Sequence, residues 1–384
     1  MQASWWTDLA QLDDEQREVI SLGTGGDHLV IGPPGCGKTN LLLLRASYLH
    51  QKGMTNIKVL TFGRVLREFI ASGTEHYTFA PDKVQTYIRW GYEVLAANGV
   101  EFEEGTDFDE TRARMFAALS AIAEQGKAEN LYDVILLDEA QDYTGDEARL
   151  ISSFGERVFA VGDDNQRITK STGALGALAG MPGLTTTKLS HHYRNGLKIC
   201  RVADGIKNLI DDPAGLEASC NYDEAANPSK VEVIGGIGVS EQTAQAVVRL
   251  KTQLQVFPDE LIGLLCPRGE DVAAVKQVLM ASDLWPLVNV QQAGSYTEFT
   301  PGQPIVLTTV QGAKGLEFRA VHILAADKLK NFPTQKNLTY TAATRAKTSL
   351  AVYHEANLAG YFEKGLNACE PKKPAEPKLQ DIFR

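Results

Sequence analysis

The sequence predicts an α/β protein built on parallel sheets, and three observations lead to that prediction. Short apolar runs alternate with helical patterns from Leu29 to Leu324, as expected for parallel strands joined by crossover helices. One apolar run, at residues 28–31, ends in a glycine-rich turn that leads directly into a helical pattern. The length of 384 residues also allows two or three domains of roughly 100–200 residues each.

The expected elements follow one another along the chain. Strands are expected at the short apolar runs 28–31, 59–62, 134–137, 158–161, 262–266, 305–309, 320–324 and 350–353. Helical patterns lie at residues 15–22, 39–50, 64–71, 86–97, 110–125 and 241–254. Prolines, glycines and asparagines in residues 211–230 predict a loop. Pro371, Pro374 and Pro377 recur every third residue in a lysine-rich tail, which is typical of an extended spacer.

The composition excludes several classes of protein. The hydrophobic content of 43% is enough for two sizeable cores, but no run of about 18 apolar residues predicts a membrane span. The N-terminal residues do not resemble a secretory signal. The five cysteines are scattered, and no pair has the spacing of a metal site, which favours a reducing, cytoplasmic setting. A net charge of −10 disfavours a broadly basic surface, although a local groove could still bind nucleic acid.

The turn at residues 32–39 is the strongest motif. It reads GPPGCGKT and fits the phosphate-binding pattern G-x-x-x-x-G-K-[ST]. Gly35 and Gly37 let backbone N–H groups surround phosphates, and the helix that follows adds its positive end. Lys38 is expected to reach the β- and γ-phosphates, and the Thr39 hydroxyl to ligate Mg²⁺. The strand before and the helix after disfavour a simple turn, so we predict that the chain binds a nucleoside triphosphate.

Two acids follow the apolar run at residues 134–137. At the carboxyl end of a parallel strand, Asp138 is expected to hold Mg²⁺ and Glu139 to position or deprotonate the attacking water. Alone, such a pair would often just end a strand, but the phosphate loop favours the catalytic interpretation. Residues 162–166 follow the next run. Gln166 there is a candidate sensor of the γ-phosphate, with an ordinary turn as the equal alternative.

Two arginines in the second half, Arg194 and Arg345, are candidates for stabilising the transferred phosphoryl group. An arginine on the developing charge accelerates such reactions by about 10³- to 10⁵-fold, although each of these alone could be a surface residue. Between them, residues 308–318 form a glycine-containing segment after a strand, with Gly315 close to the acid Glu317. This segment is either part of the site or merely a loop.

In order and wording, these motifs resemble the superfamily 1 helicases of the UvrD/Rep/PcrA group. The resemblance covers residues 12–353 and rests on segments 12–16, 32–39, 138–142, 162–166, 193–194, 314–318 and 340–346. It implies two RecA-like P-loop NTPase domains with ATP in the cleft between them. The first domain is expected at 1–188, with a reduced helical insertion at about 88–130. The second is expected at 189–365, and a tail at 366–384.

The resemblance also assigns roles around the nucleotide. It implies that Gln16 contacts adenine and that Tyr193 stacks on the ring. Arg194 would reach the γ-phosphate, Glu317 would hold the ribose, and Arg345 would be a second arginine finger. The arginines come from the second domain and would reach ATP only when the cleft closes, so closing and opening would alternate the grip on a nucleic-acid strand.

The resemblance further implies contacts to single-stranded DNA across both domains. Phe62 and Arg64 lie in the first DNA-contacting motif, and Thr86 is expected to contact a phosphate. Trp90 is a candidate for stacking on a base, which is worth about 1–3 kcal/mol where it occurs. For Trp90, a position in the core is the competing interpretation.

The sequence differs from the family pattern in the segments that the resemblance assigns to DNA binding and translocation. Both inserted subdomains are reduced or missing, and residues 167–173 lack the aromatic segment that usually follows the third motif. Gln311 stands where His is usual, and His192 where Asn is usual. The residues expected for ATP hydrolysis are all present. The sequence therefore places strand separation, rather than hydrolysis, in doubt.

The function predicted from the sequence is a monomeric, Mg²⁺-dependent, DNA-stimulated ATPase that translocates 3′→5′ on single-stranded DNA and unwinds weakly alone. Such a chain is expected in the cytoplasm of a bacterium or in a phage. A nucleotide-switched module acting on a protein partner is the rival, and RNA is the alternative strand. Residues 379–384 loosely resemble a clamp-binding peptide and are a candidate protein-binding segment, with a disordered tail as the alternative.

Overall fold

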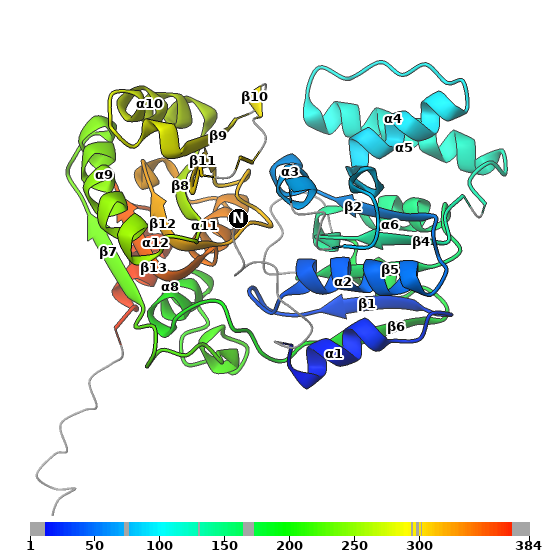
Figure 1. Ribbon diagram of the computed structural model, residues 1–384, viewed down its shortest axis with the longest axis horizontal. Helices are drawn as coiled ribbons and strands as arrows, with labels where there is room; N and C mark the ends of the chain where they lie inside the picture. Colours follow the sequence, from blue (N-terminus) through cyan, green and yellow to red (C-terminus); the bar gives the residue numbers. More distant parts are fainter. Residues whose placement is uncertain are drawn as a thin grey trace, which may run out of the picture.

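The structure, a computed structural model, describes residues 12–72, 77–129, 131–163, 173–292, 295–296, 299–300 and 302–370. Its two sheets lie side by side, one in each half of the chain (Figure 1). Both are flanked by helices, and nearly all strand pairs are parallel. The predicted fold class, two RecA-like α/β domains, is confirmed.

The first sheet has the order β3-β2-β4-β5-β1-β6, and every pair in it is parallel. Its strands are β1 (Asp27–Ile31), β2 (Ile57–Thr61), β3 (Val84–Thr86), β4 (Val134–Leu137), β5 (Val158–Gly162) and β6 (Leu184–Lys188). Strands β2, β4 and β5 are buried along their whole length, because helices cover both faces of a parallel sheet. Side chains can therefore reach a ligand only from the strand ends and the loops.

The helices of the first half are α1 (Asp14–Ser21), α2 (Lys38–Gln51), α3 (Arg64–Ser72), α4 (Tyr87–Ala97), α5 (Phe108–Glu124), α6 (Gly145–Ser152) and α7 (Leu175–Ala179). Local sequence explains where several begin. Asp13 and Gln16 form a reciprocal capping box on α1, and Thr144 forms another on α6. Helices α4 and α5 stand together at the top of Figure 1 as the short helical segment between β3 and β4.

The second sheet has the order β10-β9-β11-β8-β12-β13-β7. Its strands are β7 (Lys230–Ile234), β8 (Ile262–Cys266), β9 (Val288–Gln292), β10 (Ser295–Tyr296), β11 (Ile305–Thr309), β12 (Phe318–Ile323) and β13 (Ala346–Tyr353). Only β10 pairs antiparallel, with β9. The covering helices are α8 (Leu197–Lys207), α9 (Val239–Val256), α10 (Gly269–Met280), α11 (Pro333–Ala343) and α12 (Gly360–Asn367).

The two halves are packed against each other through α3. The Phe69 ring meets the Phe299 ring edge-on, with centroids 5.3 Å apart. A Cβ atom at Gly315 would lie 2.3 Å from the Leu66 side chain, so glycine is needed for this close approach. One apolar cluster accordingly runs from the first half into the second. Among the described residues, no helix has the length and apolar character needed to cross a membrane.

Trp90 is a core residue, so its interpretation as a base-stacking side chain is wrong. The side chain is fully buried, and the indole N–H donates to the Tyr132 hydroxyl oxygen at 3.1 Å. Its ring packs edge-on against Phe154 with centroids 5.2 Å apart. The apolar face of α4 packs onto the sheet. A position of Trp90 in the core was the competing interpretation of the helical pattern, and it is the correct one.

Candidate nucleotide site

A cavity of about 380 Å³ lies between the two halves, where loops after the strands of both sheets meet. The first half contributes Gln16, Gly35, Gly37, Lys38, Thr39, Asn40 and Glu139. The second half contributes Tyr193, Arg194, Tyr222, Asp223, Asn227, Gly315, Glu317, Arg319, Arg345 and Lys347. Every residue that the sequence analysis assigned to nucleotide contact thus lines one cavity. The remaining catalytic candidate, Gln166, lies outside the described residues.

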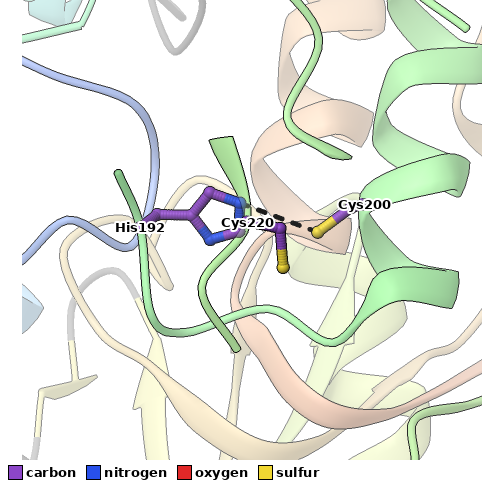
Figure 2. A group of neighbouring side chains, drawn as sticks. All are labelled: His192, Cys200 and Cys220. Atoms are coloured by element: carbon purple, nitrogen blue, oxygen red, sulfur yellow. Dashed lines mark hydrogen bonds between the residues drawn. The ribbon is translucent and has the colours of Figure 1, made fainter. Parts of the chain in front are cut away.

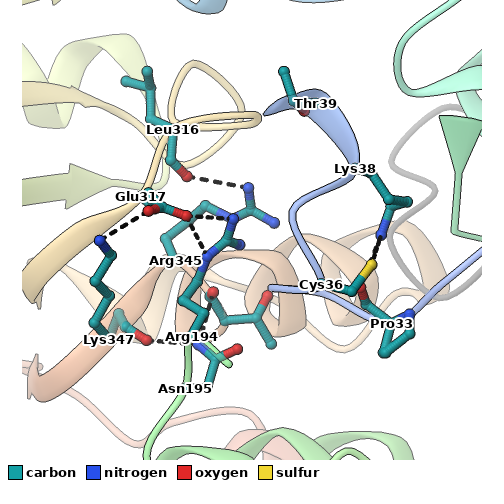
Figure 3. A network of polar contacts seen from close by, with 12 residues as sticks. Pro33, Cys36, Lys38, Thr39, Arg194, Asn195, Leu316, Glu317, Arg345 and Lys347 are labelled. Carbon is teal, nitrogen blue, oxygen red and sulfur yellow. Dashed lines mark hydrogen bonds and ion pairs between the residues drawn. The ribbon is translucent and has the colours of Figure 1, made fainter. Parts of the chain in front are cut away.

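The phosphate loop is shaped by its backbone. Gly35 and Gly37 have φ angles of 79° and 84°, which side chains other than glycine rarely adopt. A Cβ atom at Gly35 would lie 2.6 Å from the Cβ of Arg194. The Lys38 ammonium donates to the carbonyl oxygens of Gly32 and Pro33, both at 2.8 Å, so it lies over its own loop (Figure 3).

Thr39 and Asp138 form the candidate metal pair. The Thr39 hydroxyl donates to Asp138 Oδ2 at 3.1 Å. Burial and the neighbouring Glu139 raise the pKa of Asp138 above its ordinary value. A hydroxyl and a carboxylate are hard oxygen ligands of the kind that Mg²⁺ takes from proteins, usually with waters and phosphates completing its shell. The pair fits that ion.

Glu139 is held by groups from both halves. It has a left-handed backbone, with φ 51°, and its Oε2 accepts from the Gln141 amide at 2.5 Å. Lys314, from the loop between β11 and β12, lies 3.4 Å from the same oxygen. Burial raises the pKa of Glu139, but the positive charges of Lys314 and Arg345 outweigh burial, and the pKa falls below its ordinary value. The carboxylate is therefore kept charged, as a proton acceptor must be.

Lys314 also forms an ion pair with Asp142. Both side chains are almost completely buried, with exposed fractions of 4% and 0%. The pair joins the loop after β4 to the loop after β11 and so crosses between the halves. Lys314 lies in a motif that can be recognised in the sequence, but no role could be predicted for it, because its partners lie far away in the chain.

The two candidate arginine fingers are held differently (Figure 3). Arg194 donates twice to Glu317 Oε2, from Nε at 2.7 Å and from Nη2 at 2.6 Å. Lys347 lies 2.8 Å from the other oxygen of Glu317. Burial raises the pKa of Glu317, but these two cations outweigh it and lower the pKa to about 2. Arg345 is bound instead to main-chain oxygens, of Leu316 at 3.1 Å and of Thr341 at 3.3 Å.

The candidate adenine contacts, Gln16 and Tyr193, both touch the phosphate loop. The Gln16 amide N–H donates to the Cys36 carbonyl oxygen at 3.1 Å, and the amide oxygen accepts from the Asp13 backbone at 3.2 Å. The Tyr193 side chain is 40% exposed, and its backbone N–H donates to Gly35 O at 3.3 Å. Gln16 thus has to exchange partners before it can read a base.

The remaining DNA candidates lie apart from the cavity. Phe62 is half-buried, with its ring edge-on to Tyr143 and Arg112 above it at 5.3 Å. Arg64 is exposed at the start of α3, and Thr86 caps α4 by accepting from the Arg89 backbone at 3.4 Å. A Cβ atom at Gly63 would lie 3.8 Å from the Lys314 carbonyl oxygen. The segment with Phe62 and Arg64 therefore adjoins the loop that contacts Glu139.

The comparisons with known proteins find similarity in both halves. A family model described as the UvrD-like helicase C-terminal domain matches residues 304–353, and one described as an AAA domain matches residues 16–172. A solved structure, the C-terminal domain of a possible DNA helicase from Lactobacillus plantarum WCFS1, is 18% identical with a TM-score of 0.34. That similarity covers 46% of this chain and 96% of the other. No curated protein matches the chain.

Proposed function

The chain belongs to the UvrD-like helicases, and from that premise we propose that it hydrolyses ATP to move 3′→5′ along single-stranded DNA. One observation carries the proposal: a single cavity is lined by the phosphate loop and Glu139 of the first half and by Arg194 and Arg345 of the second half. A site divided in this way works only while the halves are together. Each turnover can therefore be coupled to a change in how they meet.

Besides Gln16, two cationic side chains exchange partners when ATP binds in this cavity. Lys38 leaves the carbonyl oxygens of Gly32 and Pro33 for the phosphates, and Arg194 leaves Glu317. Thr39 and Asp138 would hold Mg²⁺, which neutralises phosphate charge when it is bound. Glu139 orients the water and accepts its proton. Arg194 and Arg345 stabilise the charge that develops on the transferred group.

DNA stimulation is proposed to pass through Lys314. The loop that carries Lys314 contacts Glu139 and Asp142 in the first half and adjoins Gly63, next to the DNA candidates Phe62 and Arg64. A strand that shifts this segment would change the surroundings of the catalytic carboxylate. We propose that the same segment and Thr86 contact the strand. We also propose that the domains lie at 1–188 and from residue 189 onward. Because α12 runs to Asn367 and Leu366 is buried, the second domain extends at least to Asn367, and the tail begins after it and not at residue 366 as expected.

Weak unwinding by the isolated monomer is part of the proposal. The helical segment between β3 and β4 consists of α4 and α5 alone, and Trp90 is unavailable for stacking. Each duplex step opposes opening by about 1.4 kcal/mol on average, and a motor with few contacts to its strand slips back against that load. The monomer is expected to advance on unpaired DNA and to stall at a duplex.

The decisive experiment measures steady-state ATPase activity with single-stranded DNA, duplex DNA, RNA or no nucleic acid. A large increase with single-stranded DNA supports the motor, and displacement of streptavidin from biotinylated 3′ or 5′ ends gives the direction. An ATPase that ignores all nucleic acids but responds to a protein bound by residues 379–384 would favour the nucleotide-switched module. Stimulation by RNA alone would reassign the strand.

A further inference from the structure

A group of two thiols and one imidazole, from Cys200, Cys220 and His192, lies in the second half (Figure 2). His192 directly precedes Tyr193 and Arg194 in the chain. His192 and Cys200 are completely buried, and Cys220 is half-buried. Their nearest nitrogen and sulfur atoms all lie within 4.8 Å of one another. The proposed ATPase cycle makes no use of these three side chains.

The backbone, rather than the side chains, brings the group together. The His192 N–H donates to Ser219 O at 3.0 Å, and the Asn221 N–H donates to His192 O at 2.9 Å, which makes a short parallel bridge between His192 and Cys220. Cys200 stands on α8, which packs on this bridge. Asp204 of the same helix accepts from the backbone of Leu216 at 2.6 Å and fixes the loop before Cys220. The group is thus held in place by groups that are not its own ligands.

The side-chain contacts inside the group are weak or exchangeable. Both thiols point at one main-chain oxygen, that of Asn195, with Cys200 Sγ at 3.3 Å and Cys220 Sγ at 3.4 Å. His192 Nε2 lies 3.8 Å from Cys200 Sγ and 2.8 Å from Leu216 O. His192 Nδ1 is buried without a hydrogen bond in the described part of the chain, so it can carry the ring proton when Nε2 binds a cation.

One separation in the group is close to that of a soft, tetrahedral cation site, and the others need at most about 1 Å of adjustment. Zinc binds thiolate sulfur at about 2.3 Å and imidazole nitrogen at about 2.0–2.1 Å, and these bonds place neighbouring ligand atoms roughly 3.5–3.8 Å apart. The 3.8 Å between His192 Nε2 and Cys200 Sγ is already of that length. The Asn195 carbonyl oxygen faces both sulfur atoms and lies where the fourth ligand of a tetrahedral cation would be expected. Two thiolates and an imidazole are the ligands that select zinc over magnesium or calcium.

We propose that His192, Cys200 and Cys220 form a binding site for one divalent cation of the zinc class, with the fourth position taken by a main-chain oxygen or water. The site is separate from the Thr39–Asp138 pair and uses the opposite ligand chemistry. The bound cation would cross-link α8, the loop before Cys220 and the start of the segment that carries Tyr193 and Arg194. Its role is structural, and its existence does not depend on the proposed function.

The test titrates the reduced, full-length protein with Co²⁺ in the presence of excess Mg²⁺, which occupies hard oxygen sites. We expect a stoichiometric near-ultraviolet charge-transfer band from thiolate-bound cobalt, which Zn²⁺ then removes. Cys200→Ser and Cys220→Ser should each weaken binding by at least about 100-fold, since even changes around a ligand cost 10- to 100-fold. Cys369→Ser, at a thiol outside the group, is the matched control and should bind as the wild type does.

A second measurement covers variants that fold poorly. Zinc should raise the unfolding temperature of the wild type and of Cys369→Ser, because a ligand that binds only the native state stabilises it. The half-buried Cys220→Ala should remain folded and show no such increase. The proposal is overturned if no thiolate band appears, or if the band survives in both ligand variants. It is also overturned if Cys200 and Cys220 are found joined as a disulfide in protein that binds no cobalt.

Discussion

The two sides of the nucleotide cavity are built by different means. On the side of the first half, the phosphate loop is set by backbone geometry, with Gly35 and Gly37 at positive φ and Lys38 over main-chain carbonyls. On the side of the second half, Arg194 is held by an ion pair with Glu317. A backbone cradle keeps its shape whether or not it is filled, whereas an ion pair exchanges partners. We therefore expect Arg194, like the Lys38 ammonium, to exchange partners when nucleotide binds, while the backbone of the phosphate loop keeps its shape.

The largest expected effect tests whether the arginine side serves the transition state. Arg345→Lys should lower kcat by about 10³- to 10⁵-fold, the range measured for arginine fingers, with a much smaller change in KM for ATP. Arg319→Lys is the matched control, because Arg319 lines the same cavity but bonds the Asn227 side chain at 2.6 Å. Single-turnover hydrolysis measures both variants. A change confined to KM would mean that Arg345 only binds substrate.

Glu139→Gln tests whether the side of the cavity formed by the first half supplies the general base for hydrolysis. Removing a general base typically lowers kcat by about 10²- to 10⁴-fold, while ATP should still bind because Lys38, Thr39 and Asp138 remain. Equilibrium binding of a fluorescent ATP analogue and phosphate release, measured together, separate the two effects. Hydrolysis at the wild-type rate would remove Glu139 from its role.

Lys314→Met tests the buried contact that joins the sides. It leaves Asp142 buried without its cation, and breaking such a pair typically costs about 3–5 kcal/mol. Urea unfolding should show this loss, and the double variant Lys314→Met/Asp142→Leu should recover part of it, because Asp142 no longer carries a buried charge while Arg345 and Lys38 still lie near Glu139. Equal stabilities of the single variant and the wild type would mean that the pair does not hold the halves together.

The smallest effect concerns pH. The pKa of Glu317 is lowered to about 2 by Lys347 and Arg194 against the opposing effect of burial. A lowered carboxyl pKa stabilises the native state above the ordinary value of 4.5, and this stabilisation is lost as the pH falls toward the native pKa. The difference in unfolding free energy between wild type and Glu317→Gln should therefore shrink from neutral pH to about pH 3. A difference that does not change with pH would contradict this ion-pair account.

The motifs that could be read from the sequence are those whose parts are contiguous. The phosphate loop and the acid pair each follow a strand directly, and the loop and Glu139 line the cavity, as that spacing predicts. Strands β3, β6, β7, β9 and β10 were not anticipated, because none of them is a continuous apolar run. Trp90 shows what such local patterns do not predict. A pattern of apolar residues on a helix does not say whether that face packs against the rest of the protein or contacts a ligand.

Contacts between distant segments could not be predicted. Lys314 and Asp142 are 172 residues apart, and no local pattern connects a lysine in one loop with an acid in another. The group formed by His192, Cys200 and Cys220 could not be predicted for the same reason. Cys200 and Cys220 lack the close spacing of a metal motif, and the group forms only where the bridge between His192 and Cys220 meets helix α8, which carries Cys200.

The bare Cα of Gly35 has one more consequence. The clearance between the phosphate loop and the segment that carries Arg194 is narrower than a single methyl group, and the positive φ of Gly35 leaves little freedom to relieve the crowding. A methyl group at this position would collide with the Arg194 side chain and push the two halves apart. The absence of a side chain at residue 35 is therefore what allows the phosphate loop and the segment that carries Arg194 to lie this close together.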